Sequence, residues 1–434
     1  MTLLHRLVGR LTSDMIRLAS GMLPRRSQPL WDEGQPLDLA RARRILVVSL
    51  DEIGDTVLLT PFLRELRNAA PDSWIGLVVQ PVSAALVDTC PHIDELFRYR
   101  AALPRYLRPL VLPFRAWATA RVLRAQPPAL AIVPRWDVDQ HLAMALALFC
   151  GARRRVGYSE GVHAYKRAIN AGFDRLLTDV IPGSRQSHQV QRNLDVLRHL
   201  GAEIGSSRLE LWLEDADRES ARAWLNMPEA DERESRWVAF GIGARAAKRC
   251  WPLERFAALG RSLQQRLGVR IVLVGGQEDR AAQAAVLAGL GPGALGLCGR
   301  ATLRQTAAVL ERCRLFVGND SAPMHLAAAV GCAVVEISCH PRTGGGDHPN
   351  APERFGPWGV RSRVLRPRVP SSPCTDGCHS RRAHCILQVE VEEALEHASA
   401  LLMSRGATSR HRGRAAGGEA AGSSHGTGHT HRRL

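Results

Sequence analysis

The chain has 434 residues, of which 45% are hydrophobic, so it is long enough for two or three domains with sizeable cores. Its formal charge of +16 is concentrated at the two ends. Residues 1–44 carry eight Arg against four acids and residues 404–434 carry six Arg against one Glu, which leaves only +7 for the body. The ten Cys form no dense disulfide framework, and no apolar run approaches the roughly 20 residues of a membrane span.

The N-terminus combines apolar residues at helical spacing with arginines and lacks a signal-peptide core. It predicts either an interfacial helix on an anionic membrane or an amphipathic helix packed on the protein's own surface. We therefore expect a cytoplasmic protein, with peripheral association at the inner face of the membrane as an open alternative. The pattern consists of Leu3, Leu4, Arg6, Leu7, Arg10, Leu11, Met15, Arg17 and Leu18.

Short apolar strands alternate with helical segments in two blocks, which predicts an α/β chain with two doubly wound parallel sheets. We expect an N-terminal extension and linker at 1–43, domains at 44–213 and 214–403, and a disordered tail at 404–434. In such sheets, ligands bind beyond the carboxyl ends of strands. The clearest predicted strands are 44–50, 74–81, 130–134, 237–243, 269–276, 315–319 and 333–338.

Three loops that follow strands carry unusual residues. LDEIGD at 50–55 pairs a Gly with Asp55, which could act as a general base on a sugar hydroxyl, or Asp51 or Asp55 could simply cap the next helix. GIGARAAKRCWPLERF at 241–256 places Lys248 and Arg249 where they could bind a diphosphate, although solvated surface charge is the alternative.

The third loop, in FVGNDSAPMHLAAAVG at 316–331, ends a strand and begins a helix of small residues. Its free N–H groups and positive dipole end suit a phosphate. The structural alternative is a helix capped by Asp320 or Ser321, with Pro323 in its first turn.

In this order the motifs resemble glycosyltransferase family 9, whose best-known members are ADP-heptose:lipopolysaccharide heptosyltransferases. The resemblance runs from about residue 44 to about residue 400 and excludes the terminal extensions. It implies a GT-B fold, in which two Rossmann-like domains face each other across a cleft. The motifs that carry it are ILVVSLDEIGDTVLLTPFLREL, GARRRVGY, the KRCWPLERF segment, LVGGQEDRAA, LCGRATL, GNDSAPMHLAAAVG and PERFGPWG.

The resemblance also implies an inverting, metal-independent transfer of a sugar, with heptose from ADP expected, onto a lipopolysaccharide-core or other cell-envelope glycan. Asp55 becomes the candidate catalytic base, with Gly54 and Thr56 at the acceptor. By the same resemblance, the nucleotide-sugar donor is expected to bind the C-terminal domain, where its diphosphate would meet cations and main-chain N–H groups. The candidate donor-binding residues are Gly243, Lys248, Arg249, Asp320, Ser321, Ala322 and His325.

No cofactor or metal is expected at this site. Asp137 and Asp139 spell the Asp-x-Asp motif of metal-dependent transferases, but they lie in the acceptor half, so we interpret them as a coincidence or an acceptor contact. In CTDGCHSRRAHC, the cysteines at 374, 378 and 385 lie near His379 and His384, and they could bind zinc or remain reduced structural thiols.

Two other functions stay open. The same fold serves nucleotide-sugar epimerases, so fold alone does not decide the reaction. The basic ends would also suit a non-catalytic protein that docks on membrane or nucleic acid, but the body has no recognisable nucleic-acid module, so no specific nucleic-acid partner is expected.

Overall fold

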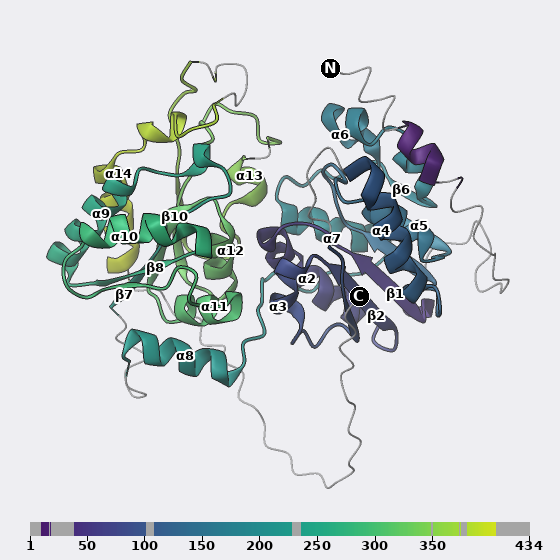
Figure 1. The fold of residues 1–434 in the computed structure, drawn as a ribbon, viewed down its shortest axis with the longest axis horizontal. Coiled ribbons are helices and arrows are strands. Elements are labelled where there is room, and N and C mark those ends of the chain that lie inside the picture. The colour runs from purple at the N-terminus through teal and green to yellow at the C-terminus, as the bar shows by residue number, and fades with distance from the viewer. Residues whose placement is uncertain are drawn as a thin grey trace, which may run out of the picture.

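The computed structural model describes residues 10–16, 18, 39–100, 108–227, 236–348, 350–372, 374 and 380–404. Two six-stranded, wholly parallel sheets form two lobes that lie side by side (Figure 1). This arrangement confirms the predicted α/β class with two doubly wound sheets. The predicted disordered tail lies outside the described residues, apart from Ser404.

The first sheet has the strand order β3-β2-β1-β4-β5-β6. Its central strands are buried along nearly their whole length, because helices cover both faces and the strands are correspondingly apolar. The elements are β1 Arg44–Val48, α2 Ile53–Ala69, β2 Trp74–Val79, α3 Pro81–Val87, β3 Glu95–Arg98, α4 Arg108–Leu123, β4 Leu130–Val133, α5 Ala143–Phe149, β5 Arg154–Tyr158, α6 Ala164–Ile169, β6 Asp179–Ile181 and α7 Gln189–His199.

The second sheet has the order β12-β11-β10-β7-β8-β9, which is the strand order of the first sheet repeated six strands later. Its strands lie within the predicted domain 214–403. The elements are α8 Asp215–Leu225, β7 Trp237–Gly241, α9 Leu253–Leu267, β8 Arg270–Val274, α10 Arg280–Ala288, β9 Ala294–Gly296, α11 Leu303–Glu311, β10 Leu315–Asn319, α12 Ala322–Ala329, β11 Ala333–Ile337, α13 Pro352–Phe355, β12 Ser362–Leu365 and α14 Val391–Met403.

The two lobes share a hydrophobic contact. Helices α2 and α3 of the first lobe pack against α11 and α12 of the second (Figure 1). One buried cluster runs through this boundary, since it contains Leu58 and Leu59 of α2 together with Ala307 of α11 and Met324 of α12. Because apolar burial holds this boundary together, the first turns of α2 and α12 lie close to each other.

A second contact crosses between the lobes through residues 347–358. The guanidinium of Arg354, which is 1% exposed, lies 3.0 Å from Asp137 of the first lobe. The indole of Trp358 stacks on His188 at 4.4 Å and donates to the carbonyl of Ser207. The PERFGPWG motif therefore joins the two lobes.

The N-terminal residues 10–16 are helical and dock on the first lobe. Ile16 is buried, and the hydroxyl of Ser13 donates to the carbonyl of Gly172 at 2.7 Å. Leu11 and Met15 are instead 54% and 66% exposed, so the helix has one packed face and one open apolar face. Among the described residues, no helix combines the length and the apolar character that a membrane span requires.

We expect Arg354→Ala to destabilise the protein. Removing this cation leaves the carboxylate of Asp137 short of a partner at the boundary between the lobes, and breaking such a pair costs about 3 kcal/mol. Thermal unfolding should show a lower Tm than wild type, with the exposed Arg363→Ala as the matched control. An equal Tm for both variants would contradict the proposed role of this contact.

Candidate functional site

The predicted loops lie at the topological switch point of each sheet. In the first sheet β1 lies between β2 and β4, and in the second β7 lies between β8 and β10. The loops after β1 and β4, and those after β7 and β10, therefore leave their sheets on opposite sides of a crevice, which is where doubly wound sheets bind ligands. This geometry brings together residues that are far apart in the sequence.

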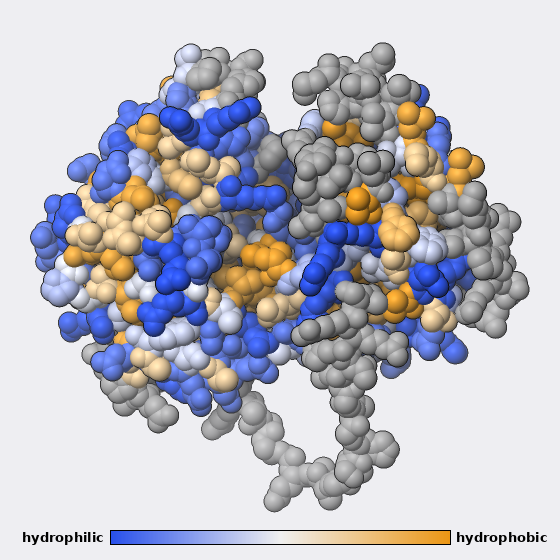
Figure 2. All heavy atoms as spheres, in the orientation of Figure 1, coloured by the Kyte–Doolittle hydropathy of each residue, from blue (hydrophilic) through white to orange (hydrophobic). Residues whose placement is uncertain are grey.

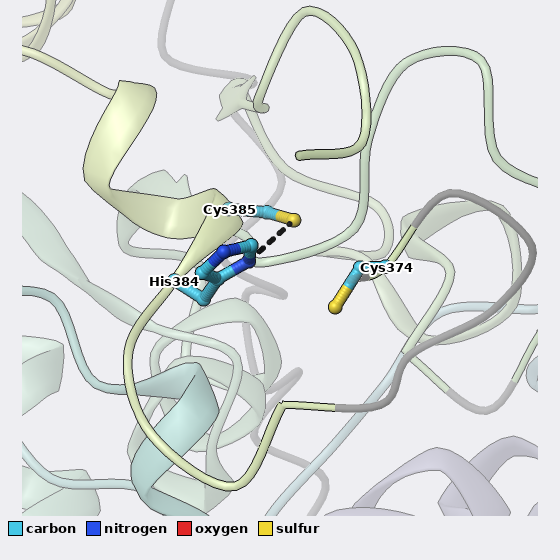
Figure 3. Close-up of side chains that lie close together, drawn as sticks. All are labelled: Cys374, His384 and Cys385. Atoms are coloured by element: carbon cyan, nitrogen blue, oxygen red, sulfur yellow. Dashed lines mark hydrogen bonds between the residues drawn. The ribbon is translucent and has the colours of Figure 1, made fainter. Parts of the chain in front are cut away.

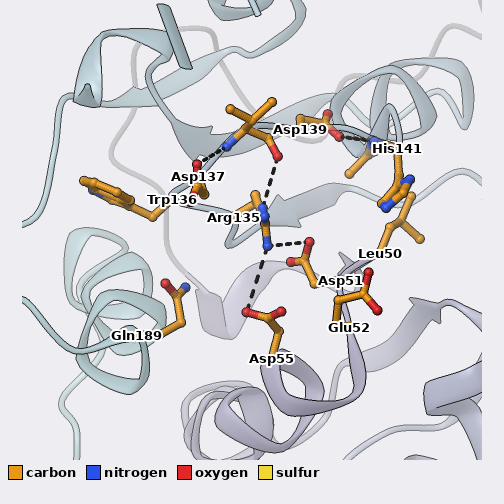
Figure 4. Close-up of polar contacts among 12 residues, drawn as sticks. Leu50, Asp51, Glu52, Asp55, Arg135, Trp136, Asp137, Asp139, His141 and Gln189 are labelled. Atoms are coloured by element: carbon orange, nitrogen blue, oxygen red, sulfur yellow. Dashed lines mark hydrogen bonds and ion pairs between the residues drawn. The ribbon is translucent and has the colours of Figure 1, made fainter. Parts of the chain in front are cut away.

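In the first lobe, Arg135 lies between two carboxylates (Figure 4). Its Nη1 atom is 2.6 Å from Asp51 Oδ1 and 4.0 Å from Asp55 Oδ1. Burial raises the pKa of Asp51 to about 7 and also raises the pKa of Asp55, while the charge of Arg135 acts in the opposite direction. Neither aspartate is the N-cap of α2, which is Glu52, so the capping interpretation does not describe them.

A buried lysine shapes the loop that carries Arg135. Lys166 Nζ donates to the carbonyls of Arg135, Trp136 and Tyr158 at 3.0–3.3 Å. Because these three acceptors surround the ammonium group, the backbone at Arg135 is fixed. Sequence reasoning missed Asp51, Arg135 and Lys166 as contributors to the site. The available signals were that Asp51 follows β1 and that Lys166 is one of only two lysines.

Asp137 and Asp139 have separate structural roles. Asp139 accepts hydrogen bonds from the N–H groups of Ala143 and Met144 at 2.9 Å and so holds the start of α5. Asp137 contacts His163 and Arg354, and these contacts lower its pKa although burial acts in the opposite direction. Both carboxylates are thus committed to protein partners.

In the second lobe, Asn319 ties the loop after β7 to the loop after β10. Its side chain accepts from the N–H of Trp251 at 3.0 Å and donates to the carbonyl of Ile242 at 2.8 Å. Gly243 lies in this loop, where an added Cβ would lie 2.0 Å from Asp279 Oδ1. A larger residue at position 243 would therefore force the side chain of Asp279 to move.

The two predicted cations differ in their partners. Arg249 lies 3.1 Å from Asp320 Oδ2 and donates to Asn350 at 2.7 Å. Lys248 makes no ion pair with any residue in the described part of the chain, and it lines a cavity. Burial and the charge of Asp55 raise the pKa of Asp320, while Arg249 acts in the opposite direction.

Helix α12 begins at Ala322 after the N-cap Ser321, whose side chain makes no capping hydrogen bond. Within the described ranges, the N–H groups of Ser321 and Ala322 donate to no protein acceptor. His325 is buried, which lowers its pKa to about 3, and it packs on the other lobe. A Cβ added to Gly54 would lie 2.6 Å from His325 Cδ2, so these two predicted residues touch across the boundary.

Thr56, predicted at the acceptor, is buried within α2, and its hydroxyl donates to the carbonyl of Glu52 at 3.2 Å. A cavity of about 10 Å³, room for roughly one water molecule, adjoins Asp51 and Asp55 in the same lobe. The acceptor side of the boundary is therefore narrow next to Asp55.

A much larger cavity of about 460 Å³ lies in the second lobe beyond β11. Lys248 lines it, whereas Gly243, Arg249, His325 and the 320–322 segment do not. None of the described residues that line it is acidic, and Lys248 is a cation, so this part of the wall suits an anion. The lining residues are Lys248, Cys339, His340, Pro341, Thr343, Gly344, Gly345, His348, Asn350, Pro370, Cys374, Ser380, His384 and Cys385.

Glu336 in β11 carries a buried carboxyl group close enough to Asp320 and Arg249 to interact with their charges. It is 1% exposed, and its Oε2 atom has no hydrogen-bond partner in the described part of the chain. Burial and the charge of Asp320 raise its pKa well above the ordinary value of 4.5. The folded state therefore holds a proton that the unfolded chain releases as pH rises above about 4.5, and this lowers stability with rising pH.

We expect Glu336→Gln to remove this pH dependence. At about pH 8 the variant should have a higher Tm than wild type, while near pH 4.5 the difference should be small. Thermal unfolding at several pH values checks this, with the exposed Glu203→Gln as control. A Tm difference that stays constant with pH would contradict the proton held by Glu336.

Comparison with known proteins identifies a matching family model and several similar heptosyltransferases. The model of "Glycosyltransferase family 9 (heptosyltransferase)" matches residues 138–383. Lipopolysaccharide heptosyltransferase 3 of Escherichia coli is 24% identical over 292 residues, which cover 65% of this chain and 80% of that protein. Lipopolysaccharide heptosyltransferase 2 of E. coli K12 is 28% identical over 166 residues, 36% of this chain and 43% of that protein.

Solved structures share the fold. A glycosyltransferase family 9 protein from Veillonella parvula superposes with a TM-score of 0.69 at 24% identity and covers 86% of this chain and 99% of its own. The E. coli ADP-heptose lps heptosyltransferase II gives a TM-score of 0.61 at 20% identity, with coverage of 83% and 98%. The architecture is the GT-B fold.

Proposed function

Because the chain belongs to glycosyltransferase family 9, we propose that it transfers heptose from an ADP donor onto a lipopolysaccharide-core acceptor, with inversion and without a metal at the reacting centre. Family membership makes the chain a transferase, so the alternative of a non-catalytic binding protein is wrong. The names of its relatives, which are lipopolysaccharide heptosyltransferases, support the sugar and the acceptor.

One observation carries this proposal: the first turns of α2 and α12 meet. Gly54 contacts His325, and the charge of Asp55 is close enough to raise the pKa of Asp320. A candidate base from one lobe therefore faces the helix N-terminus of the other, where N–H groups with no acceptor among the described residues can donate hydrogen bonds to a phosphate.

In the proposed reaction, the acceptor hydroxyl attacks the anomeric carbon from the face opposite the diphosphate. Asp55 takes the hydroxyl proton, and its pKa, raised by burial, makes it a stronger base than an exposed aspartate. The bond from the anomeric carbon to the diphosphate oxygen breaks, and the nucleoside diphosphate leaves with the electron pair. Configuration at the anomeric carbon is thereby inverted.

Charge on the leaving group is balanced by protein groups. Lys248, which has no ion pair in the described part of the chain, can meet the diphosphate as a point charge without breaking another contact. Arg249 must first loosen its contact with Asp320, so we propose Lys248 as the main phosphate contact. The N–H groups of Ser321 and Ala322 add fixed dipoles, which together with Lys248 can replace a metal ion.

We expect Asp55→Asn to lower turnover of ADP-heptose with a lipopolysaccharide-core acceptor by roughly 10²–10⁴-fold, because the base is lost. Lys248→Ala should lower it by roughly 100-fold, since one stabilising contact is lost. In the wild type, turnover should fall as the pH is lowered, and the apparent pKa of this fall should be higher than the ordinary aspartate pKa of 3.8. Release of ADP and the stereochemistry of the glycoside are the measurements.

The exposed Asp215→Asn, whose side chain is 97% accessible, is the matched control and should keep full activity. Unchanged turnover in Asp55→Asn would exclude the proposed base. If an epimerised sugar nucleotide forms without acceptor and no ADP is released, the reaction is epimerisation and the proposed transfer is excluded.

We also propose that the enzyme works at the inner face of the cell membrane. The outer face of the N-terminal helix exposes Leu11, Met15 and Leu18 beside Arg10, and Phe114 of α4 is 66% exposed in the same lobe. Apolar surface is visible in Figure 2 around this helix and α4. Arginine next to exposed leucine suits an anionic lipid surface, where a glycolipid acceptor is found.

Replacing Leu11, Met15 and Leu18 by Ser should weaken binding to anionic lipid vesicles by about tenfold or more, because the apolar contact with the bilayer is lost. Vesicle cosedimentation measures this, and Val369→Ser, an exposed apolar residue of the other lobe, is the control. Equal binding of the triple variant and wild type would contradict the interfacial helix.

A further inference from the structure

Three potential metal ligands lie together on the wall of the large cavity. The ligand atoms of Cys374, His384 and Cys385 all lie within 4.8 Å of one another, and Figure 3 shows both sulfurs near the imidazole. The two thiols are buried and the imidazole is half-buried. Across the described ranges, no other group of three His, Cys, Asp or Glu side chains is arranged this way.

The spacing fits a tetrahedral site with small adjustments. Zinc–sulfur and zinc–nitrogen bonds of about 2.3 and 2.0 Å place a sulfur and a nitrogen about 3.5 Å apart, and two sulfurs about 3.8 Å apart. Cys385 Sγ lies 3.4 Å from His384 Nδ1, which already matches. Since all separations are within 4.8 Å, the remaining ones need a contraction of about 1.3 Å at most, which a change in a side-chain torsion supplies.

The backbone around the ligands is held in place without a metal. The side chain of Gln388 donates to Val369 and Ser371 at 2.8 Å, and the N–H of Ser371 contacts Cys385 Sγ at 3.5 Å. These contacts join the segment that precedes Cys374 to the one that follows His384. The ligands from both segments therefore meet on a backbone framework that is already held in place by these hydrogen bonds.

The surroundings also suit a cation bound by thiolates. Burial lowers the pKa of His340 and lowers that of His348 to about 4, so both imidazoles are neutral at physiological pH. Two thiolates then balance the charge of a divalent ion, and a fourth tetrahedral position remains for water or another ligand.

We propose that Cys374, His384 and Cys385 bind one divalent cation of the zinc class, which links the two segments at the rim of the cavity. The cation has a structural role, because it fixes one part of the cavity wall and takes no part in the transfer. The proposal stands apart from the transferase mechanism, since it concerns the wall and not the reacting groups.

The test uses the full-length chain, stripped with a chelator and kept reduced with a non-thiol reductant. Titration with Co²⁺ should give one equivalent of a near-ultraviolet thiolate-to-cobalt absorption band. The double variant Cys374→Ser/Cys385→Ser should lose the band, while Cys90→Ser, whose thiol lies in the other lobe, should keep it. Histidines in residues 405–434 are present in every variant and bind cobalt without producing this band.

Zinc should also raise the Tm of the stripped wild type but not that of the double variant, whose Tm with chelator shows whether it is folded. A wild type without the thiolate band, a band that survives in the double variant, or a Cys374–Cys385 disulfide found by mass spectrometry would each overturn the proposal. Because none of these readouts involves sugar transfer, failure here is distinguishable from failure of the proposed function.

Discussion

The contact between Gly54 and His325 is the constraint on which the arrangement of the two lobes depends. It brings the N-termini of α2 and α12 together at the boundary, where any side chain at position 54 would collide with the imidazole ring. The burial that the contact creates keeps His325 neutral, with a pKa of about 3. An uncharged ring adds packing without placing a second positive charge near Arg249.

Charge at the boundary is nearly balanced in the absence of ligand. Asp51 and Asp55 share Arg135, while Asp320 pairs with Arg249. Burial disfavours the charged form of all three carboxylates, and each guanidinium restores part of that loss. An arriving diphosphate would therefore meet a set of charges already satisfied by one another, apart from Lys248.

Sequence patterns predicted the architecture and the loops, because buried parallel strands read as continuous apolar runs and switch-point loops follow them directly. Short edge strands such as β3 and β6 have weaker patterns and were not predicted. The partners of the candidate residues were also missed. Arg135, Lys166 and Asn319 act through contacts with backbone or carboxylates far away in the sequence, and nothing in their local pattern records those contacts.

The repeated strand order of the two sheets has a consequence for how such an enzyme can change over time. Each half contributes its own pair of loops, and none of the strands in the described part of the chain is shared between the sheets. Mutations that reshape the loops after β1 and β4 leave the framework of the opposite half intact, and the reverse also holds. Under the proposed function, the half that would bind the acceptor can thus change independently of the half that would bind the nucleotide.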